Sequence, residues 1–236
     1  MASRRGPDLP YKVVAGVTPW GSNWIVASAK MHAATFAPEP PKVYATFLEV
    51  LQERPSFSAI VVNAPVGLVD DSQSVNRTCD RQARALLGRR GSAIHNAPTR
   101  EQLSRDPSIR AQGIDAVTAA LLPRYREVAA EMSPYRQRIV YEGHPELSFY
   151  QLNGNKPLSW SKKIQAGKSE RRRILESRMP GADKILESEL KRVPLKHLMD
   201  VAAMLWTARR VYGHAAIRLP KEGEWDSEGL RMELVY

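Results

Sequence analysis

The chain has 236 residues, 43% of them hydrophobic, and a single cysteine, Cys79. This length suits one α/β domain with a substantial core, and a lone cysteine excludes an internal disulfide, a cysteine-based zinc site and a disulfide-rich secreted fold. The sequence contains no stretch of about 18 consecutive apolar residues, which argues against a membrane-spanning helix, and we expect a cytoplasmic protein with no membrane partner.

The net charge of +10 is concentrated in two segments. Residues 77–90 hold five Arg and one Asp, and residues 156–173 hold four Lys, three Arg and one Glu. Their net charges, +4 and +6, account for the whole excess. Two basic patches favour a polyanion such as nucleic acid as the partner, and solvated helix faces are the alternative explanation.

The first half of the chain predicts a β-hairpin, a helix and a buried strand. YKVVAGVT and NWIVASAKM are apolar runs joined by PWGS, and a short edge strand around 34–37 follows. PKVYATFLEVLQER predicts a helix with Pro41 near its start, and AIVVNAPVGL predicts a buried strand and a turn. We expect the next helix to begin with Ser74 as N-cap and to end at Gly88 or Gly91.

The second half is mostly helical in pattern. We expect a helical region at 99–132, interrupted by Pro107 and Pro123, then a strand in QRIVYEGH and a helix that opens at Pro145. A basic helical segment at 153–193 precedes the strongest helix, PLKHLMDVAAMLWTARRVYG, and a terminal pair of strands, AIRLP and LRMELVY. The expected organisation is a flexible basic arm at 1–10 and a domain at 11–236, with 99–132 and 153–193 as helical insertions.

This order of elements is that of RNase H-like domains. GVTPWGSNWIVA, VVNAPVGL, NRTCDRQARALLGRRGSAIHNAP, YEGHPELSF, SKKIQAGKSERRRIL and MDVAAMLWTARRVYG resemble successive blocks of a bacterial domain-of-unknown-function family predicted to be RNase H-like nucleases. The resemblance covers about 13–236. It implies an α/β fold with a mixed sheet, an antiparallel N-terminal hairpin, flanking helices and a helical insertion. It also implies acids that hold Mg²⁺ or Mn²⁺ against a phosphodiester.

Two acids of this family pattern are replaced in the chain. Thr18 stands on the first strand, and Asn63 stands at the end of the AIVV strand, where the family has Asp. A hydroxyl and an amide offer oxygen atoms to a metal but carry no charge. We therefore expect a degenerate metal site made of Asn63, Glu142 and Asp200, with Thr18 at the position of a lost acid.

The remaining matching acids and one histidine are the catalytic candidates: Glu142, Glu146, Asp200 and His144. Asp200 lies among apolar residues of the late helix, where burial is costly without a cation or a donor; a hydrogen-bonded structural Asp is the alternative. The helix dipole alone explains an acid at Glu146. For His144 the alternatives are a proton shuttle and a helix cap.

The candidate substrate contacts are basic residues. Three arginines share one helix face with Asp80 and are expected either to face phosphate or to form intrahelical ion pairs; they are Arg77, Arg81 and Arg84. Lys162, Lys163 and Arg171 are expected to contact the nucleic-acid backbone or to serve solubility. We expect His95 and His197 to be ordinary surface or packing residues.

Three functions fit these features. The first is an RNase H-like protein that binds nucleic acid and has weak or no metal-dependent phosphodiester hydrolysis. The second is an active metal-dependent nuclease that uses the remaining acids, and the third is a non-catalytic protein-interaction module. An actin-like ATPase arrangement ranks last, because GVTPWGSNW carries no acid. The sequence leaves the substrate and the oligomeric state open.

Overall fold

The computed structural model describes residues 10–71, 76–105, 113–190 and 192–236. The first nine residues of the expected basic arm, the expected cap Ser74 and Pro107 lie outside these ranges. In the described part of the chain, no helix has both the length and the apolar character needed to cross a bilayer.

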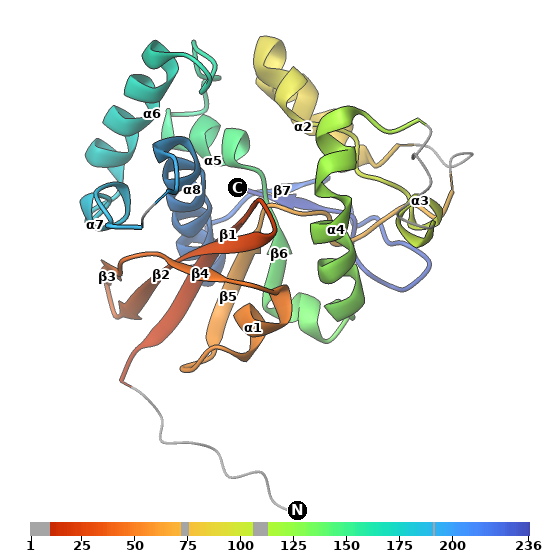
Figure 1. Cartoon of the computed structure of the whole chain (residues 1–236), viewed down its shortest axis with the longest axis horizontal. Coiled ribbons are helices and arrows are strands. Elements are labelled where there is room, and N and C mark those ends of the chain that lie inside the picture. Colours follow the sequence, from red (N-terminus) through yellow and green to blue (C-terminus); the bar gives the residue numbers. More distant parts are fainter. Residues whose placement is uncertain (1–9, 72–75, 106–112, 191) are drawn as a thin grey trace, which may run out of the picture.

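The centre of the fold is a mixed sheet with strand order β3-β2-β1-β5-β6 (Figure 1). Its strands are β1 (Lys12–Trp20), β2 (Asn23–His32), β3 (Thr35–Pro38), β4 (Lys42–Tyr44), β5 (Phe57–Val62) and β6 (Val140–Glu142). β1 and β2 form an antiparallel hairpin, and β3 and β4 both pair antiparallel with β2. β5 runs parallel to β1 and β6 runs parallel to β5, so the carboxyl ends of these three strands reach the same edge of the sheet.

Helices cover both faces of this sheet. They are α1 (Phe47–Gln52), α2 (Thr78–Leu87), α3 (Arg100–Ser104), α4 (Ala116–Glu131), α5 (Pro145–Leu152), α6 (Gln165–Arg178), α7 (Asp183–Leu186) and α8 (Leu195–Tyr212). The shorter elements are the 3₁₀ turns η1 (Gly88–Ala93) and η2 (Arg136–Arg138) and the antiparallel pair β7 (Arg218–Leu219) and β8 (Leu234–Val235). α5 to α8 pack on one face, and α1 and α4 pack on the other (Figure 1). This mixed α/β sheet with an antiparallel hairpin and flanking helices confirms the predicted fold class.

Helix α8 lies directly on β1. A Cβ atom added at Gly16 would come within 2.1 Å of the Leu205 nitrogen and 2.7 Å of the Val201 carbonyl oxygen, so only glycine permits this approach. Side chains alternate along a strand, and Thr18 therefore projects to the same face as Gly16. The close contact thus brings Thr18 toward α8, where Asp200 directly precedes Val201.

Two predicted helix boundaries are wrong. Residues 42–44 form β4 and not the first turn of a helix, because they pair with β2, and α1 begins only after Thr46, whose hydroxyl caps the Glu49 nitrogen. Pro123 does not interrupt its helix, since it lies on an exposed side of α4 and the helix continues to Glu131. In both places the tertiary setting overrides local propensity.

The carboxylate of Glu127 links α4 to the hairpin. Glu127 accepts hydrogen bonds from the Trp24 indole at 2.8 Å and from the Phe47 backbone nitrogen at 3.0 Å, and it pairs with Arg124 at 2.7 Å. A buried indole N–H and the first nitrogen of α1 thereby find a shared acceptor. The position of α4 is fixed relative to both β2 and α1.

Candidate functional site

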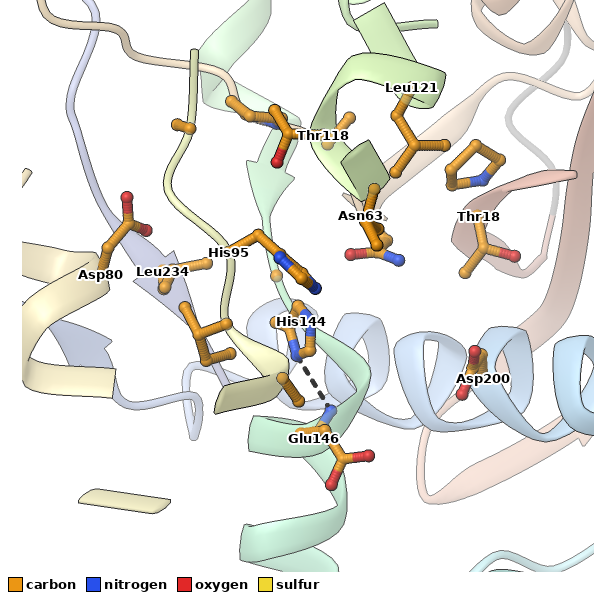
Figure 2. Close-up of a pocket in the computed structure, with 18 of the residues that line it drawn as sticks. Thr18, Asn63, Asp80, His95, Thr118, Leu121, His144, Glu146, Asp200 and Leu234 are labelled. Carbon is orange, nitrogen blue, oxygen red and sulfur yellow. Dashed lines mark hydrogen bonds between the residues drawn. The ribbon is translucent and has the colours of Figure 1, made fainter. Parts of the chain in front are cut away.

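A pocket of about 470 Å³ opens at the shared carboxyl edge of β1, β5 and β6 (Figure 2). Its lining includes the four positions predicted for a metal site, which come from β1, from the residue after β5, from the end of β6 and from α8: Thr18, Asn63, Glu142 and Asp200. Helix α4 contributes a further wall. The chain therefore brings the predicted residues together around one cavity.

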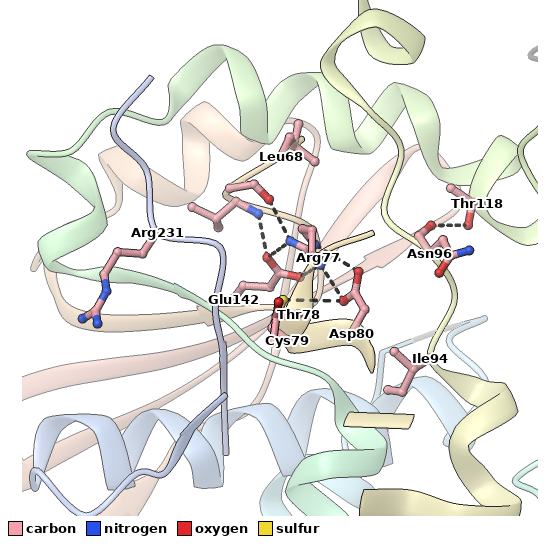
Figure 3. Close-up of polar contacts among 12 residues, drawn as sticks. Leu68, Arg77, Thr78, Cys79, Asp80, Ile94, Asn96, Thr118, Glu142 and Arg231 are labelled. Atoms are coloured by element: carbon pink, nitrogen blue, oxygen red, sulfur yellow. Dashed lines mark hydrogen bonds and ion pairs between the residues drawn. The ribbon is translucent and has the colours of Figure 1, made fainter. Parts of the chain in front are cut away.

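Glu142 is bound by a buried arginine (Figure 3). Arg77 donates from Nη2 to Glu142 Oε1 at 2.6 Å and from Nη1 to Oε2 at 2.7 Å, and the Val66 nitrogen also donates to Oε2 at 2.9 Å. The same guanidinium donates to both carboxylate oxygens of Asp80, at 2.8 and 3.0 Å, and to the Gly67 carbonyl at 2.8 Å. Arg77 is only 3% exposed. One buried cation is thus shared by two carboxylates.

The charges in this cluster depend on one another. Burial opposes the charge of Arg77, but Asp80 and Glu142 outweigh it and raise the Arg77 pKa, so the guanidinium stays protonated. Burial raises the pKa of Glu142, and the charge of Arg77 acts in the opposite direction. Loss of either partner of an ion pair this deeply buried would leave an unpaired buried charge and strongly lower the stability of the fold.

Glu146 is likewise bound by arginines. Its Oε1 accepts from Arg171 at 2.5 Å and from Arg90 at 3.1 Å. Burial acts to raise the pKa of Glu146, but the charges of Arg171 and Arg90 outweigh it, and the pKa is lowered. Arg171 has no exposed surface and lies over the Phe149 ring. Both roles expected for Arg171, contact with the nucleic-acid backbone and solubility, are therefore wrong, because its buried guanidinium binds Glu146 inside the protein.

Asp200 is paired with a lysine. Its Oδ2 accepts a hydrogen bond from Lys162 Nζ at 2.5 Å, and its Oδ1 is buried without a hydrogen-bond partner among the described residues. The Thr18 hydroxyl is also buried without a partner there. Lys162 comes from the connection between α5 and α6, and its side chain is 35% exposed, against 6% for Asp200. Asp200 is therefore neutralised from the open side of the pocket.

His144 caps helix α5 (Figure 2). Its Nδ1 accepts a hydrogen bond from the Glu146 nitrogen at 3.1 Å, which is the cap that the sequence offered as one alternative. Burial lowers the pKa of His144 to about 4, so the imidazole is neutral at pH 7. Because Nδ1 accepts, the ring proton is on Nε2, and this nitrogen is a donor.

The arginines at the N-cap of α2 and along that helix do not act together. Arg77 is buried as described, whereas Arg81 is exposed and donates to the Asn76 carbonyl, and Arg84 donates to the Ile94 carbonyl at 3.1 Å. Neither Arg81 nor Arg84 is part of the pocket lining, but the exposed Lys163 is. A phosphate role for Arg81 and Arg84 stays a prediction, with no support from the pocket.

His95 and His197, which the sequence analysis took for ordinary surface or packing residues, both line the pocket. His95 Nδ1 lies 3.1 Å from Asp115 Oδ1, and Asp115 also caps α4 by accepting from the nitrogens of Val117 and Thr118. Figure 2 shows the His95 imidazole at the cavity. No short motif joins His95 to Asp115, so only the fold reveals this pair.

These residues do not fit a two-metal site. Mg²⁺ and Mn²⁺ pairs require several free carboxylates. Arg77 occupies both oxygens of Glu142, while Glu146 and Asp200 each already hold a protein cation. Among the described residues, no group of three His, Cys, Asp or Glu side chains is placed to bind a metal ion.

Comparison with known proteins identifies the family. No curated protein matches the chain. A solved structure of RuvC from Thermus thermophilus is similar at 14% sequence identity, covering 86% of this chain and 97% of that one, with a TM-score of 0.38. That value is too low to say anything about activity. The family model described as "Protein of unknown function (DUF429)" matches residues 16–224. Because this match spans most of the sequence, the chain belongs to the DUF429 family.

Proposed function

We propose that this protein binds nucleic acid at the pocket and hydrolyses phosphodiesters with divalent metals weakly or not at all. The observation that carries the proposal is the charge pairing of the acids: Glu142 and Asp80 share Arg77, Glu146 pairs with Arg171 and Arg90, and Asp200 pairs with Lys162. Protein cations are already paired with the acids that a metal ion would need, so little free negative charge is left to hold Mg²⁺.

The cavity suits a phosphate-bearing strand. Its volume of about 470 Å³ is within the range of small-ligand sites, which is roughly 300 to 1,000 Å³. Lys163 is exposed at the pocket, Arg90 is partly exposed, and His144 offers its Nε2 proton as a hydrogen-bond donor. Ammonium and guanidinium groups around a cavity support phosphate contacts without base readout.

Binding is tested by fluorescence anisotropy with single-stranded, duplex and hybrid oligonucleotides over a series of salt concentrations. We expect affinity at low salt that falls as salt rises, and we expect Lys163→Ala to weaken binding and lower the salt slope by about 1. Lys184→Ala is the matched control, because Lys184 is exposed on α7 and does not line the pocket. No affinity for any oligonucleotide at low salt would refute the proposal.

An active metal-dependent nuclease is the second candidate. Three buried oxygens of the pocket lining have no hydrogen-bond partner among the described residues and favour it: Asp200 Oδ1, Glu146 Oε2 and Thr18 Oγ1. Incubating the same oligonucleotides with Mg²⁺ or Mn²⁺ decides between the two functions. Multiple turnovers that Asp200→Asn abolishes would establish the nuclease, whereas absent or slight cleavage supports the binding protein.

The double substitution Thr18→Asp with Asn63→Asp tests whether the pocket retains the shape of a metal site. We expect tighter Mn²⁺ binding, because two carboxylates would be added to the lining. If a folded variant binds Mn²⁺ no more tightly than the wild type, positions 18 and 63 do not belong to a metal site.

A further inference from the structure

One side of the pocket is apolar. Helix α4 places three residues from successive turns on the cavity, and they form one stripe along the helix, which we name the α4 stripe: Val117, Leu121 and Tyr125. The buried residues of α4 that pack into the core are different ones, among them Leu122 and Val128. Val117 is 51% exposed, and Leu121 and Tyr125 are partly buried. The α4 stripe therefore presents apolar surface to the cavity and not only to the core.

The side across the cavity is basic. Figure 2 shows Asp200 across the pocket from Leu121, and Asp200 binds Lys162. Lys163 follows in the chain, is exposed and also lines the pocket, as does Arg90, whose side chain is 17% exposed. Because Asp200 already balances the charge of Lys162, Lys163 is the better placed of the two lysines to meet an anion from solvent. A ligand that fits this pocket is apolar at one end and anionic at the other.

We propose that the pocket holds one unpaired nucleotide of a single strand, with its base against the α4 stripe and its phosphate at Lys163. This inference rests on the nucleic-acid binding proposed above and specifies which form of nucleic acid binds. A nucleotide has a flat base at one end and a charged phosphate at the other, as the two sides of the pocket require. Side chains that cover a base face accept any base, and a lysine contacts phosphate without reading sequence, so binding should depend little on base identity.

A duplex cannot offer the same contact at low cost. Its internal bases are stacked on both faces and paired at their edges, and extruding one of them costs the free energy of unstacking and unpairing. A single strand presents unstacked bases that protein side chains can cover. The α4 stripe is also fixed before binding, because Glu127 of the same helix accepts from the Trp24 indole and the Phe47 nitrogen, and a preformed surface loses less free energy on binding. The pocket should therefore prefer single strands to duplexes.

The first test compares three labelled probes by fluorescence anisotropy at the same low salt concentration. They are an oligothymidine single strand, the same strand paired with its complement, and an abasic strand of equal length, which keeps the phosphates but has no bases. We expect the wild type to bind the single strand about tenfold more tightly than either other probe, because only the single strand offers an unpaired base. Equal or tighter binding of the duplex or the abasic strand would overturn the inference.

The second test assigns the base contact to the α4 stripe. Leu121→Gln should weaken binding of oligothymidine about fivefold and leave binding of the abasic strand unchanged, whereas Lys163→Ala should weaken both. Leu48→Gln is the matched control, because Leu48 is 39% exposed on α1 and does not line the pocket. Val117→Gln, at a more exposed position of the same stripe, replaces Leu121→Gln if the latter does not fold.

The outcomes separate this inference from the proposed function. A folded variant of the α4 stripe that keeps wild-type affinity for oligothymidine would refute the inference alone. Binding of all three probes without preference for unpaired bases would do the same and leave nucleic-acid binding in place. Failure of every probe to bind would refute both.

Discussion

Replacement of Arg77 by methionine tests whether the buried cation holds the pocket floor together. The guanidinium makes two bonds to Glu142, two to Asp80 and one to the Gly67 carbonyl, at 2.6 to 3.0 Å. Methionine fills much of the same volume but leaves two buried carboxylates without a cation. Removing one partner of a buried ion pair costs about 3 to 5 kcal/mol, a large share of a typical unfolding free energy of about 5 to 15 kcal/mol.

The free energy of unfolding is measured by urea denaturation at pH 7.5, with circular dichroism as the signal. Arg81→Met is the matched control, because Arg81 lies one turn further along α2 and is exposed, and its side chain donates to the Asn76 carbonyl and the Thr78 hydroxyl within the described part of the chain. We expect the control to lose less than about 1 kcal/mol. An Arg77→Met loss no larger than that of Arg81→Met would refute the reasoning.

The loss of stability caused by Arg77→Met should also depend on pH. Burial already raises the pKa of Glu142, and removal of Arg77 raises it further, because the opposing charge is gone. The folded variant then takes up a proton that its unfolded chain releases, so its stability rises as pH falls. The difference between Arg77→Met and wild type should therefore shrink between pH 8 and pH 6. Adding Glu142→Gln to Arg77→Met should restore part of the loss at pH 8, where the lone carboxylate costs most.

Two further variants probe His144 and the contact between β1 and α8. The folded-state pKa of His144, about 4, lies below its ordinary value of 6.5, so the stability that neutral His144 provides is complete above pH 6.5 and is lost as pH falls toward 4. The free energy of unfolding of the wild type should fall between pH 7.5 and pH 5, and His144→Asn, which keeps a capping side chain, should make this fall about 2 kcal/mol smaller. If urea denaturation gives the same fall for both proteins, the lowered pKa of His144 is contradicted. Gly16→Ala should cost about 3 kcal/mol or prevent folding, because its Cβ would meet α8 backbone atoms at 2.1 to 2.7 Å. Gly213→Ala, whose Cβ would meet the Arg209 carbonyl oxygen only at 3.4 Å, is the control, and equal melting temperatures for the two would contradict the packing argument.

Patterns confined to neighbouring residues predicted the fold well. The apolar runs at 11–18 and 23–31 form the hairpin, Pro145 begins α5, and the apolar stripe around Asp200 forms α8. These features depend on strand and helix periodicity and on cap chemistry, all of which are local. The start of α1 was missed because β4 is held by pairing with β2, a contact that no local pattern contains.

The partners of the site residues were not predictable in the same way. The sequence indicated that Glu142, Glu146 and Asp200 meet at one edge, and the pocket contains all three. It did not indicate which cation binds each acid. Arg77 meets Glu142 only because the start of α2 lies beside the end of β6, and Lys162 meets Asp200 only because the α5–α6 connection lies over α8. The sequence left phosphate contact and an intrahelical ion pair as alternatives for Arg77, and the fold surrounds its guanidinium with five acceptor oxygens, including both of Asp80, which makes it part of the core.

The anchoring of α4 by Glu127 has a consequence for what the pocket can admit. Thr118, Leu121 and Tyr125 line the cavity from a helix that is tied to the hairpin through the Trp24 indole, so this boundary is a rigid template. The opposite boundary, with Ser161, Lys162 and Lys163, is a connection without regular structure. Residues 94–97 also line the cavity without regular structure, so ligands of different width are expected to displace these two connections rather than α4, and the lysine connection would then select by size and by charge at once.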